Sequence, residues 1–318
     1  MAYLLLAWGV GMTSFAKLLQ QFDPDAPFVS PPNWQQGRTI FGGLSAALSL
    51  QAVLRERPAD FPPFKSAQVS FIAPVTQAQT FDVSVLRQGR SVTSVSVDCL
   101  SGDDLALRTI LLFAQPRASR ITHDSWGRPF VEGPSHYATL ALDSKIAPAC
   151  AYNFEMRPAG GSLPVSGAES PELLMWVRHL DAQGVDPAVA LIALADSLPP
   201  AAMTCFTEPA AISSASWMID LPQPAAAGEW FLVSSFSQQA LEGYSLQDME
   251  IWDESGRRVL WARQTVAIFL PNTNNPGCTP QSSNPRVPIM KKIIFKAPRG
   301  PRRCARHFSC ACKRFCPE

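Results

Sequence analysis

Little in the chain suggests a membrane or an export route. The apolar start, residues 1–11, is far shorter than the ~20 apolar residues that span a bilayer, and it has neither a basic beginning nor a clear cleavage site. Met12 is an alternative start, because Thr13 and Ser14 precede a pattern typical of a capped amphipathic helix. The short apolar start predicts no membrane span. Because no peroxisomal Ser-Lys-Leu signal ends the chain, we predict a cytoplasmic location.

Cysteine is scarce before residue 271 and clustered after it. Cys99, Cys150 and Cys205 are widely spaced, which predicts free, buried thiols in a reducing compartment and no disulfide framework. Five more follow, with His307 among them, and provide enough ligands for zinc in a spacing that matches no regular site, so we predict no metal. These five are Cys278, Cys304, Cys310, Cys312 and Cys316.

Charge divides the chain into two unlike parts. The formal net charge is +1, but residues 271–318 hold ten basic residues and one acid, or +9, which leaves −8 for the rest. An acidic body does not favour nucleic acid as a partner. The tail is Pro-rich and then basic and Cys-rich, so we expect it to be disordered. Its abrupt composition also fits an altered reading frame or a mispredicted end.

Two segments share one order of predicted elements. Each has an apolar helix followed by four alternating strands, and the landmarks Pro74 and Pro222 lie roughly 150 residues apart. This order predicts an α+β fold in which each curved antiparallel sheet wraps a helix that is apolar all round. The predicted helices are residues 44–57 and 187–197. The predicted strands are residues 67–72, 81–86, 92–99 and 105–114, then 215–221, 230–238, 246–252 and 259–270.

The same pattern predicts the domain organisation. An N-terminal segment, 1–32, precedes the first repeat, 33–116; a linker, 117–170, precedes the second repeat, 171–270, and the tail, 271–318. The linker is rich in Pro, Gly and Ser, yet we expect some local order in it. Four aromatic side chains are expected to pack on the body: Trp126, Phe130, Tyr137 and Phe154.

Polar residues interrupt three successive apolar elements of the second repeat. Asp196 ends the apolar helix, Ser213 and Ser214 lie at the start of the next strand, and Gln264 lies in the last strand. Burying an unpaired carboxylate or amide costs several kcal/mol, roughly, so we expect these side chains to meet one another or a substrate. Purely structural roles are the alternative: a turn cap for Asp196, a strand-entry hydroxyl, and a polar strand face for Gln264.

Six short segments, taken in order, carry a family resemblance. The chain resembles the TesB-type (type II) acyl-CoA thioesterases, which are double-hotdog proteins, over about residues 33–270. No single segment is specific, whereas the ordered set is. The segments are Arg38-Thr39-Ile40-Phe41-Gly42-Gly43, Phe71-Ile72-Ala73-Pro74, Val85-Leu86-Arg87-Gln88-Gly89-Arg90-Ser91, Ala195-Asp196-Ser197-Leu198-Pro199-Pro200, Ile212-Ser213-Ser214 and Arg263-Gln264.

The resemblance implies a site and a reaction. The family's Asp, Thr or Ser, and Gln fall on Asp196, Ser214 (or Ser213, if the alignment slips by one) and Gln264. It implies hydrolysis of fatty acyl-CoA by direct water attack, with Asp196 as the base and no cofactor. Gly42 and Gly43 would let the substrate approach the backbone at a helix start, although taken alone these residues favour a structural role. An offset of roughly 145 residues makes Gln51 the counterpart of Asp196 in the first repeat. Because Gln51 is not an acid, we expect one site per chain.

Other enzyme classes fit the residues less well. Hotdog hydratases use histidine with a carboxylate, and none of the four histidines follows an Asp by five residues or lies in the predicted cores. No Gly-x-Ser-x-Gly elbow of a serine hydrolase occurs. A non-catalytic acyl-CoA-binding or scaffold hotdog remains the alternative. The acyl chain length and the choice between a monomer and a homo-oligomer are left open by the sequence.

Overall fold

The computed structural model describes residues 12–58, 60–124, 127–144, 146–223 and 228–270. The predictions about the start of the chain, the aromatic residue at position 126, and the basic tail with its cysteines concern residues outside these ranges.

One large sheet dominates the described residues. Its ten antiparallel strands follow the order β4-β5-β6-β3-β9-β12-β11-β10-β8-β7, and a separate two-stranded sheet pairs β1 with β2. The strands are β1 Gln35–Gln36, β2 Thr39–Ile40, β3 Phe64–Phe71, β4 Gln79–Gln88, β5 Val92–Ser101, β6 Asp104–Ala114, β7 Phe154–Gly161, β8 Glu172–His179, β9 Ala211–Asp220, β10 Phe231–Leu241, β11 Tyr244–Asp253 and β12 Arg258–Phe269. The helices are α1 Phe15–Gln21, α2 Gly42–Glu56 and α3 Pro187–Ala195, with short 3-10 helices η1 Pro32–Trp34, η2 Pro134–His136, η3 Ala149–Asn153 and η4 Ala201–Cys205.

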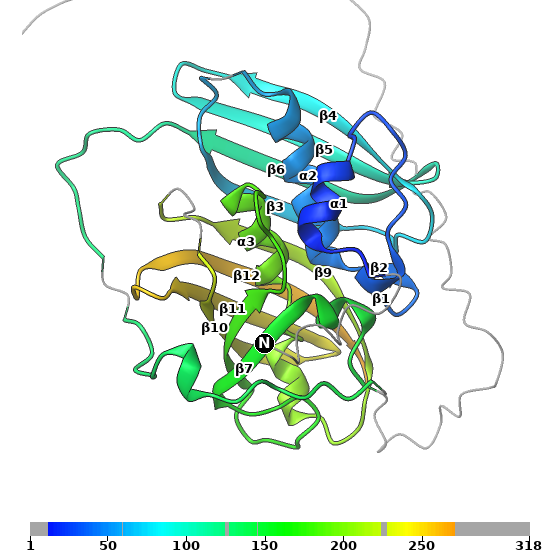
Figure 1. Ribbon diagram of the computed structural model, residues 1–318, viewed down its shortest axis with the longest axis vertical. Coiled ribbons are helices and arrows are strands. Elements are labelled where there is room, and N and C mark those ends of the chain that lie inside the picture. The colour runs from blue at the N-terminus through cyan, green and yellow to red at the C-terminus, as the bar shows by residue number, and fades with distance from the viewer. Residues whose placement is uncertain (1–11, 59, 125–126, 145, 224–227, 271–318) are drawn as a thin grey trace, which may run out of the picture. The chain divides into compact units, whose positions relative to one another are not determined.

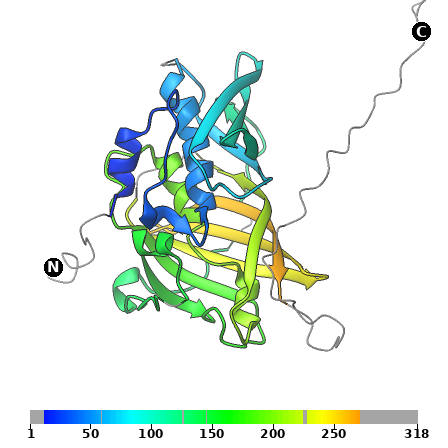
Figure 2. The ribbon, with the colours of Figure 1, turned by 90° about the vertical axis from the view of Figure 1, so that its right-hand side faces the viewer.

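The sheet consists of two similar halves that meet where β3 pairs with β9. Figure 1 shows α2 beside the first half and α3 beside the second, and the side view places both helices on the same face of the sheet (Figure 2). This is the predicted α+β double hotdog, and every predicted helix and strand is found with ends that differ by a few residues.

Two further strands, β7 and β8, extend the second half and were not predicted. β8 lacks the alternation of a half-buried strand because both of its faces are covered. Its outward side chains Leu174 and Trp176 join a second, smaller core with Trp230 and Trp252, against which Tyr137 packs. β7 contains Pro158 and two glycines, which read as loop residues in the sequence.

The two long helices run antiparallel in close contact. The first turn of α2 lies against Asp196, which follows α3. At the other end, Arg57, which follows α2, forms an ion pair of 3.6 Å with Asp186, which precedes α3. Asp186 also caps α3, because its carboxylate accepts a hydrogen bond from the Ala188 N–H at 2.9 Å. The two helices are therefore held together by a contact at each end: Asp196 against the start of α2, and Arg57 with Asp186.

Side-chain hydrogen bonds fix the first helix and the contact between Asn33 and Asn153. The predicted capped helix is present as α1, where Ser14 Oγ accepts a hydrogen bond from the Lys17 N–H. Asn33 Nδ2 donates to Asn153 Oδ1 at 2.7 Å, and Asn153 Nδ2 donates back to the Asn33 carbonyl at 2.7 Å. Asn153 also donates to the carbonyl of Cys150, so η3 is held in a defined place.

Three predictions about single residues need correction. Cys205 is exposed, whereas Cys99 and Cys150 are free and buried as predicted. Phe130 is fully exposed and does not pack on the body, although Phe154 does. His179 lies in the core against α3, where its Nε2 donates to the Ala190 carbonyl at 2.8 Å and burial lowers its pKa to about 4. The sequence missed it because β8 itself was missed.

The alternation in β9 generates a stability prediction. Ile219 faces the core and is 0% exposed, whereas its neighbour Met218 faces outward and is 44% exposed. Ile219→Ala should lower the free energy of unfolding by ~2–5 kcal/mol, because it leaves a cavity in a packed core. Met218→Ala should change it by only about 0.5 kcal/mol. Urea unfolding of both variants checks this, and equal losses would contradict the assigned faces.

Candidate functional site

The carboxylate of Asp196 lies where α3 ends and α2 begins. Asp196 Oδ1 accepts a hydrogen bond of 2.9 Å from Gln264 Nε2, and the backbone N–H of Gly43 donates to the same carboxylate. The carboxylate thus meets the positive end of the α2 dipole as well as an amide. The structure brings together Asp196, Gln264, Gly42 and Gly43, all of which the sequence had selected.

Glycine is required at the start of α2. A Cβ atom on Gly43 would lie 2.7 Å from Asp196 Cβ and 2.7 Å from the ring of Phe41, closer than real Cβ contacts. A Cβ atom on Gly42 would lie 3.1 Å from Asp196 Oδ2 and 3.1 Å from the ring of Phe71. The absence of side chains here is what lets the helix start reach the carboxylate.

A second buried glutamine supports Gln264. The side chains of Gln264 and Gln247 are 3% and 1% exposed, and they lie directly opposite each other on β12 and β11. Gln247 Nε2 donates to Gln264 Oε1 at 3.3 Å, and Gln247 Oε1 accepts from the Ala201 N–H at 2.6 Å. Sequence reasoning missed Gln247, although its place in the buried alternation of β11 with Met249 was a usable signal.

Ser214 shares the inner face with Gln264. In the ladder between β9 and β12, Ser214 lies opposite Val266, whose side chain is buried on the same face as Gln264. Ser213 lies opposite Ala267 and is exposed on the other face. Ser214 is half-buried, and within the described residues no hydrogen bond joins its hydroxyl to Asp196 or Gln264. Its part in the site therefore stays a prediction that rests on the register.

Two more polar groups lie beside these residues without a partner. Trp217 lies directly opposite Gln264 in the ladder and is 1% exposed, and its indole N–H has no hydrogen-bond partner among the described residues. The same holds for the hydroxyl of Ser197, which follows Asp196. Buried donors normally have hydrogen-bond partners, so both groups are exceptions to the usual rule.

The surroundings tune Asp196 for proton transfer near neutral pH. Burial, the largest effect, raises the pKa of its carboxyl from 3.8 to about 6, while hydrogen bonds from Gln264 and Gly43 act in the opposite direction. The thiol of Cys150 in η3 lies close enough to Asp196 to be affected by the negative charge of the Asp196 carboxylate. Burial and then the negative charge of Asp196 raise the pKa of Cys150 to about 12, so this thiol stays protonated.

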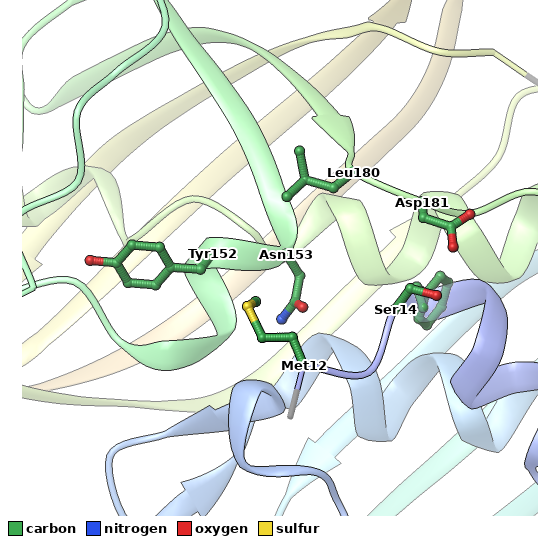
Figure 3. A pocket seen from close by; sticks show the side chains of 7 residues that line it. Met12, Ser14, Tyr152, Asn153, Leu180 and Asp181 are labelled. Carbon is green, nitrogen blue, oxygen red and sulfur yellow. The ribbon is translucent and has the colours of Figure 1, made fainter. Parts of the chain in front are cut away.

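Two cavities found among the described residues lie away from Asp196. One, of about 10 Å³, is shown in Figure 3 between the N-terminal segment (Met12, Ser14) and the residues around Asn153 and Asp181. It can hold about one water molecule and no acyl chain. The other, of about 240 Å³, lies beside α1, and Asp196 lines neither of them.

Among the residues that the structure describes, no group of three or more His, Cys, Asp or Glu side chains could hold a metal ion. Among the same residues, no helix is both long enough and apolar enough to cross a bilayer.

The titration of Asp196 generates a stability prediction. Between its ordinary pKa of 3.8 and about 6, the folded chain binds more protons than the unfolded chain, so the free energy of unfolding falls as pH rises through this window. At about 1.4 kcal/mol per pKa unit, the loss is at most ~3 kcal/mol. Asp196→Asn removes the titration, so this variant should be more stable than the parent at pH ~7.5 but not at pH ~4. Urea unfolding across this range checks it, and parallel pH curves would contradict it.

Comparison with known proteins places the chain in a family. A family model of the acyl-CoA thioesterase N-terminal domain matches residues 30–114, and one of the acyl-CoA thioesterase C-terminal domain matches residues 131–268. A comparison with curated proteins gives no match.

Solved structures show the same fold. A hotdog protein of unknown function from Alicyclobacillus acidocaldarius is 19% identical with a TM-score of 0.67, covering 76% of this chain and 91% of its own. A putative thioesterase II from Thermobifida fusca is 19% identical with a TM-score of 0.65, covering 75% and 90%. An acyl-CoA thioesterase II, TesB2, from Mycobacterium marinum is 19% identical with a TM-score of 0.60, covering 73% and 90%. Because the two family models match in order and together cover more than half of the sequence, the chain belongs to the family of TesB-type, double-hotdog acyl-CoA thioesterases.

Proposed function

We propose that this protein hydrolyses fatty acyl-CoA thioesters to the free acid and CoA. The observation that carries the proposal is the partly buried carboxylate of Asp196, which receives hydrogen bonds from Gln264 and the Gly43 N–H and has a pKa of about 6. Such a group is mostly ionised at neutral pH and still basic enough to take a proton from water. The family membership agrees with this substrate and this reaction.

The proposed reaction is direct attack by water. Asp196 takes one proton from a water molecule while the oxygen of that water forms a bond to the thioester carbonyl carbon. Gln264 and Ser214 hold the water, since an amide and a hydroxyl can both donate and accept. The tetrahedral intermediate then breaks its C–S bond, and the proton on Asp196 passes to the departing CoA sulfur.

Donors for the carbonyl oxygen come from the backbone and from the unpartnered groups. The first turn of α2 presents its N–H groups where the helix dipole favours a developing negative charge. Gly43 already donates to Asp196, which leaves the Gly42 N–H for the substrate. The indole N–H of Trp217 and the hydroxyl of Ser197 are additional donors for an acyl oxygen. Donors placed before the reaction stabilise an oxyanion without reorganisation.

A covalent acyl-enzyme is not part of the proposal. The thiol of Cys150 stays protonated because its pKa is raised to about 12. Ser214 is not hydrogen-bonded to Asp196, so no base is in place to activate its hydroxyl. These two observations support water as the nucleophile.

Replacing the proposed base tests the function. Short-, medium- and long-chain acyl-CoAs would be offered to the purified protein while release of free thiol is followed. Asp196→Asn should lower kcat by ~10²–10⁴-fold, the usual contribution of a general base. Asp248→Asn, on the outer face in a surface ion pair with Arg263, should keep close to the parent rate. Full activity of Asp196→Asn would exclude this mechanism, and no activity of the parent on any substrate would favour the non-catalytic acyl-CoA-binding or scaffold role.

The two serines provide a matched pair. Ser214→Ala removes a hydroxyl from the inner face and should lower kcat about tenfold, the value of one hydrogen bond made to the attacking water. Ser213→Ala removes a hydroxyl from the outer face and should leave kcat unchanged, because the register turns it away from Gln264. Kinetics of the two variants with one acyl-CoA decide the assignment, and the reverse result would show that the register places the wrong serine at the site.

A further inference from the structure

A directed series of hydrogen bonds leads from the backbone to the proposed base. It starts at the Ala201 N–H, passes through the side chains of Gln247 and Gln264, and ends at Asp196 Oδ1. The three bonds measure 2.6, 3.3 and 2.9 Å. Both amides are buried, so water does not compete for their groups.

The first donor determines the orientation of every group that follows. A backbone N–H can only donate, so Gln247 must turn Oε1 toward Ala201 and its NH₂ toward Gln264. Gln264 must therefore turn its Oε1 toward Gln247, and its NH₂ toward Asp196. The two ends of an amide have nearly the same shape, so the hydrogen-bond network alone decides between them.

We propose that Gln247 is a positioning residue that, through Gln264, holds a hydrogen-bond donor and not an acceptor against Asp196. Its catalytic meaning rests on the function proposed above. If Gln264 turned over, its Oε1 would face the carboxylate of Asp196, and the repulsion between the two oxygens would favour the protonated acid. Gln247 prevents this because it offers Gln264 a donor and no acceptor on that side.

The fold itself does not require an amide at this position. Across the junction between the halves, Val69 lies opposite Trp217, and the ladders on the two sides correspond. In the second half Trp217 lies beside Gln264 and then Gln247; in the first half Val69 lies beside Thr109 and then Val97. Val97 therefore occupies the position in the first half that corresponds to Gln247, and the fold forms there without an amide. The buried amide of Gln247 is specific to the second half.

Other charged groups near Asp196 do not take over this role. The start of α2 contributes only glycine backbone, and in η3 the thiol of Cys150 stays protonated. On β12 the neighbouring cation Arg263 is on the outer face, paired with Asp248. Within the described residues, then, the donor that faces the carboxylate from the sheet is the Gln264 amide.

The test is the pH at which Asp196 gains its proton. Gln247→Met keeps the length of the side chain but removes both amide contacts, and it should move the acid limb of kcat/KM upward by about half to one pH unit. Gln247→Glu still accepts from the Ala201 N–H but draws the Gln264 NH₂ toward itself, so its shift should be larger. Gln79→Met, which removes a buried amide of the first half that donates to Ser45 and Cys99, is the matched control and should leave the limb in place.

A second readout separates this proposal from the proposed function. Carboxyl ¹³C NMR of Asp-labelled protein, with the signal assigned through Asp196→Asn, follows the same proton without any substrate. An upward shift in both Gln247 variants supports positioning even if the parent hydrolyses no acyl-CoA. An unchanged Asp196 titration in folded Gln247→Met and Gln247→Glu would overturn the proposal, whatever the activity.

Discussion

The close approach of two helix ends is the contact on which the site depends. Asp196 follows the last turn of α3, and Gly43 lies in the first turn of α2, near enough that a Cβ atom on Gly43 would overlap Asp196. Bringing a carboxylate this far from water is unfavourable, and the raised pKa of Asp196 records that cost. The helix N–H and the Gln264 amide offset part of it, so the carboxylate is stabilised by the groups that also orient it.

The same contact makes the two halves unequal. At the opposite end of the helix pair, Arg57 and Asp186 form an ion pair, and Asp186 caps its own helix at Ala188. Gln51, the counterpart of Asp196 by sequence offset, lies inside α2 because α2 has 15 residues and α3 has nine. One end of the helix pair therefore holds an ion pair and a helix cap, and the other holds the partly buried carboxylate of Asp196. This geometry supports the expectation of one site per chain.

A single bulge decides which serine faces the interior. Thr265 lies opposite Ser216, but Val266 lies opposite Ser214, so Ala215 is an extra residue in β9. Without it, strict alternation from Trp217 would turn Ser213 inward, because side chains two and four residues apart share a face. The sequence left Ser213 and Ser214 both open because the alignment can slip by one residue there, and a bulge leaves no sure mark in the chain that would settle it. Sequence reasoning missed Gln247 because its hydrogen-bond partner Gln264 lies on another strand. Which residues of two strands lie opposite each other depends on the register, as the choice between the serines does.

The sequence by itself determined the double α+β repeat, its helices and most of its strands, and the two polar residues that proved to be hydrogen-bonded, Asp196 and Gln264. Helical and strand periods, turn residues and a polar side chain in an apolar run are local properties that a chain carries in its order of residues. Only the tertiary structure decided that β7 and β8 extend the sheet, that Gln247 orients Gln264, and that α2 reaches Asp196. These features depend on register, bulges and helix packing, which arise between residues far apart in the chain.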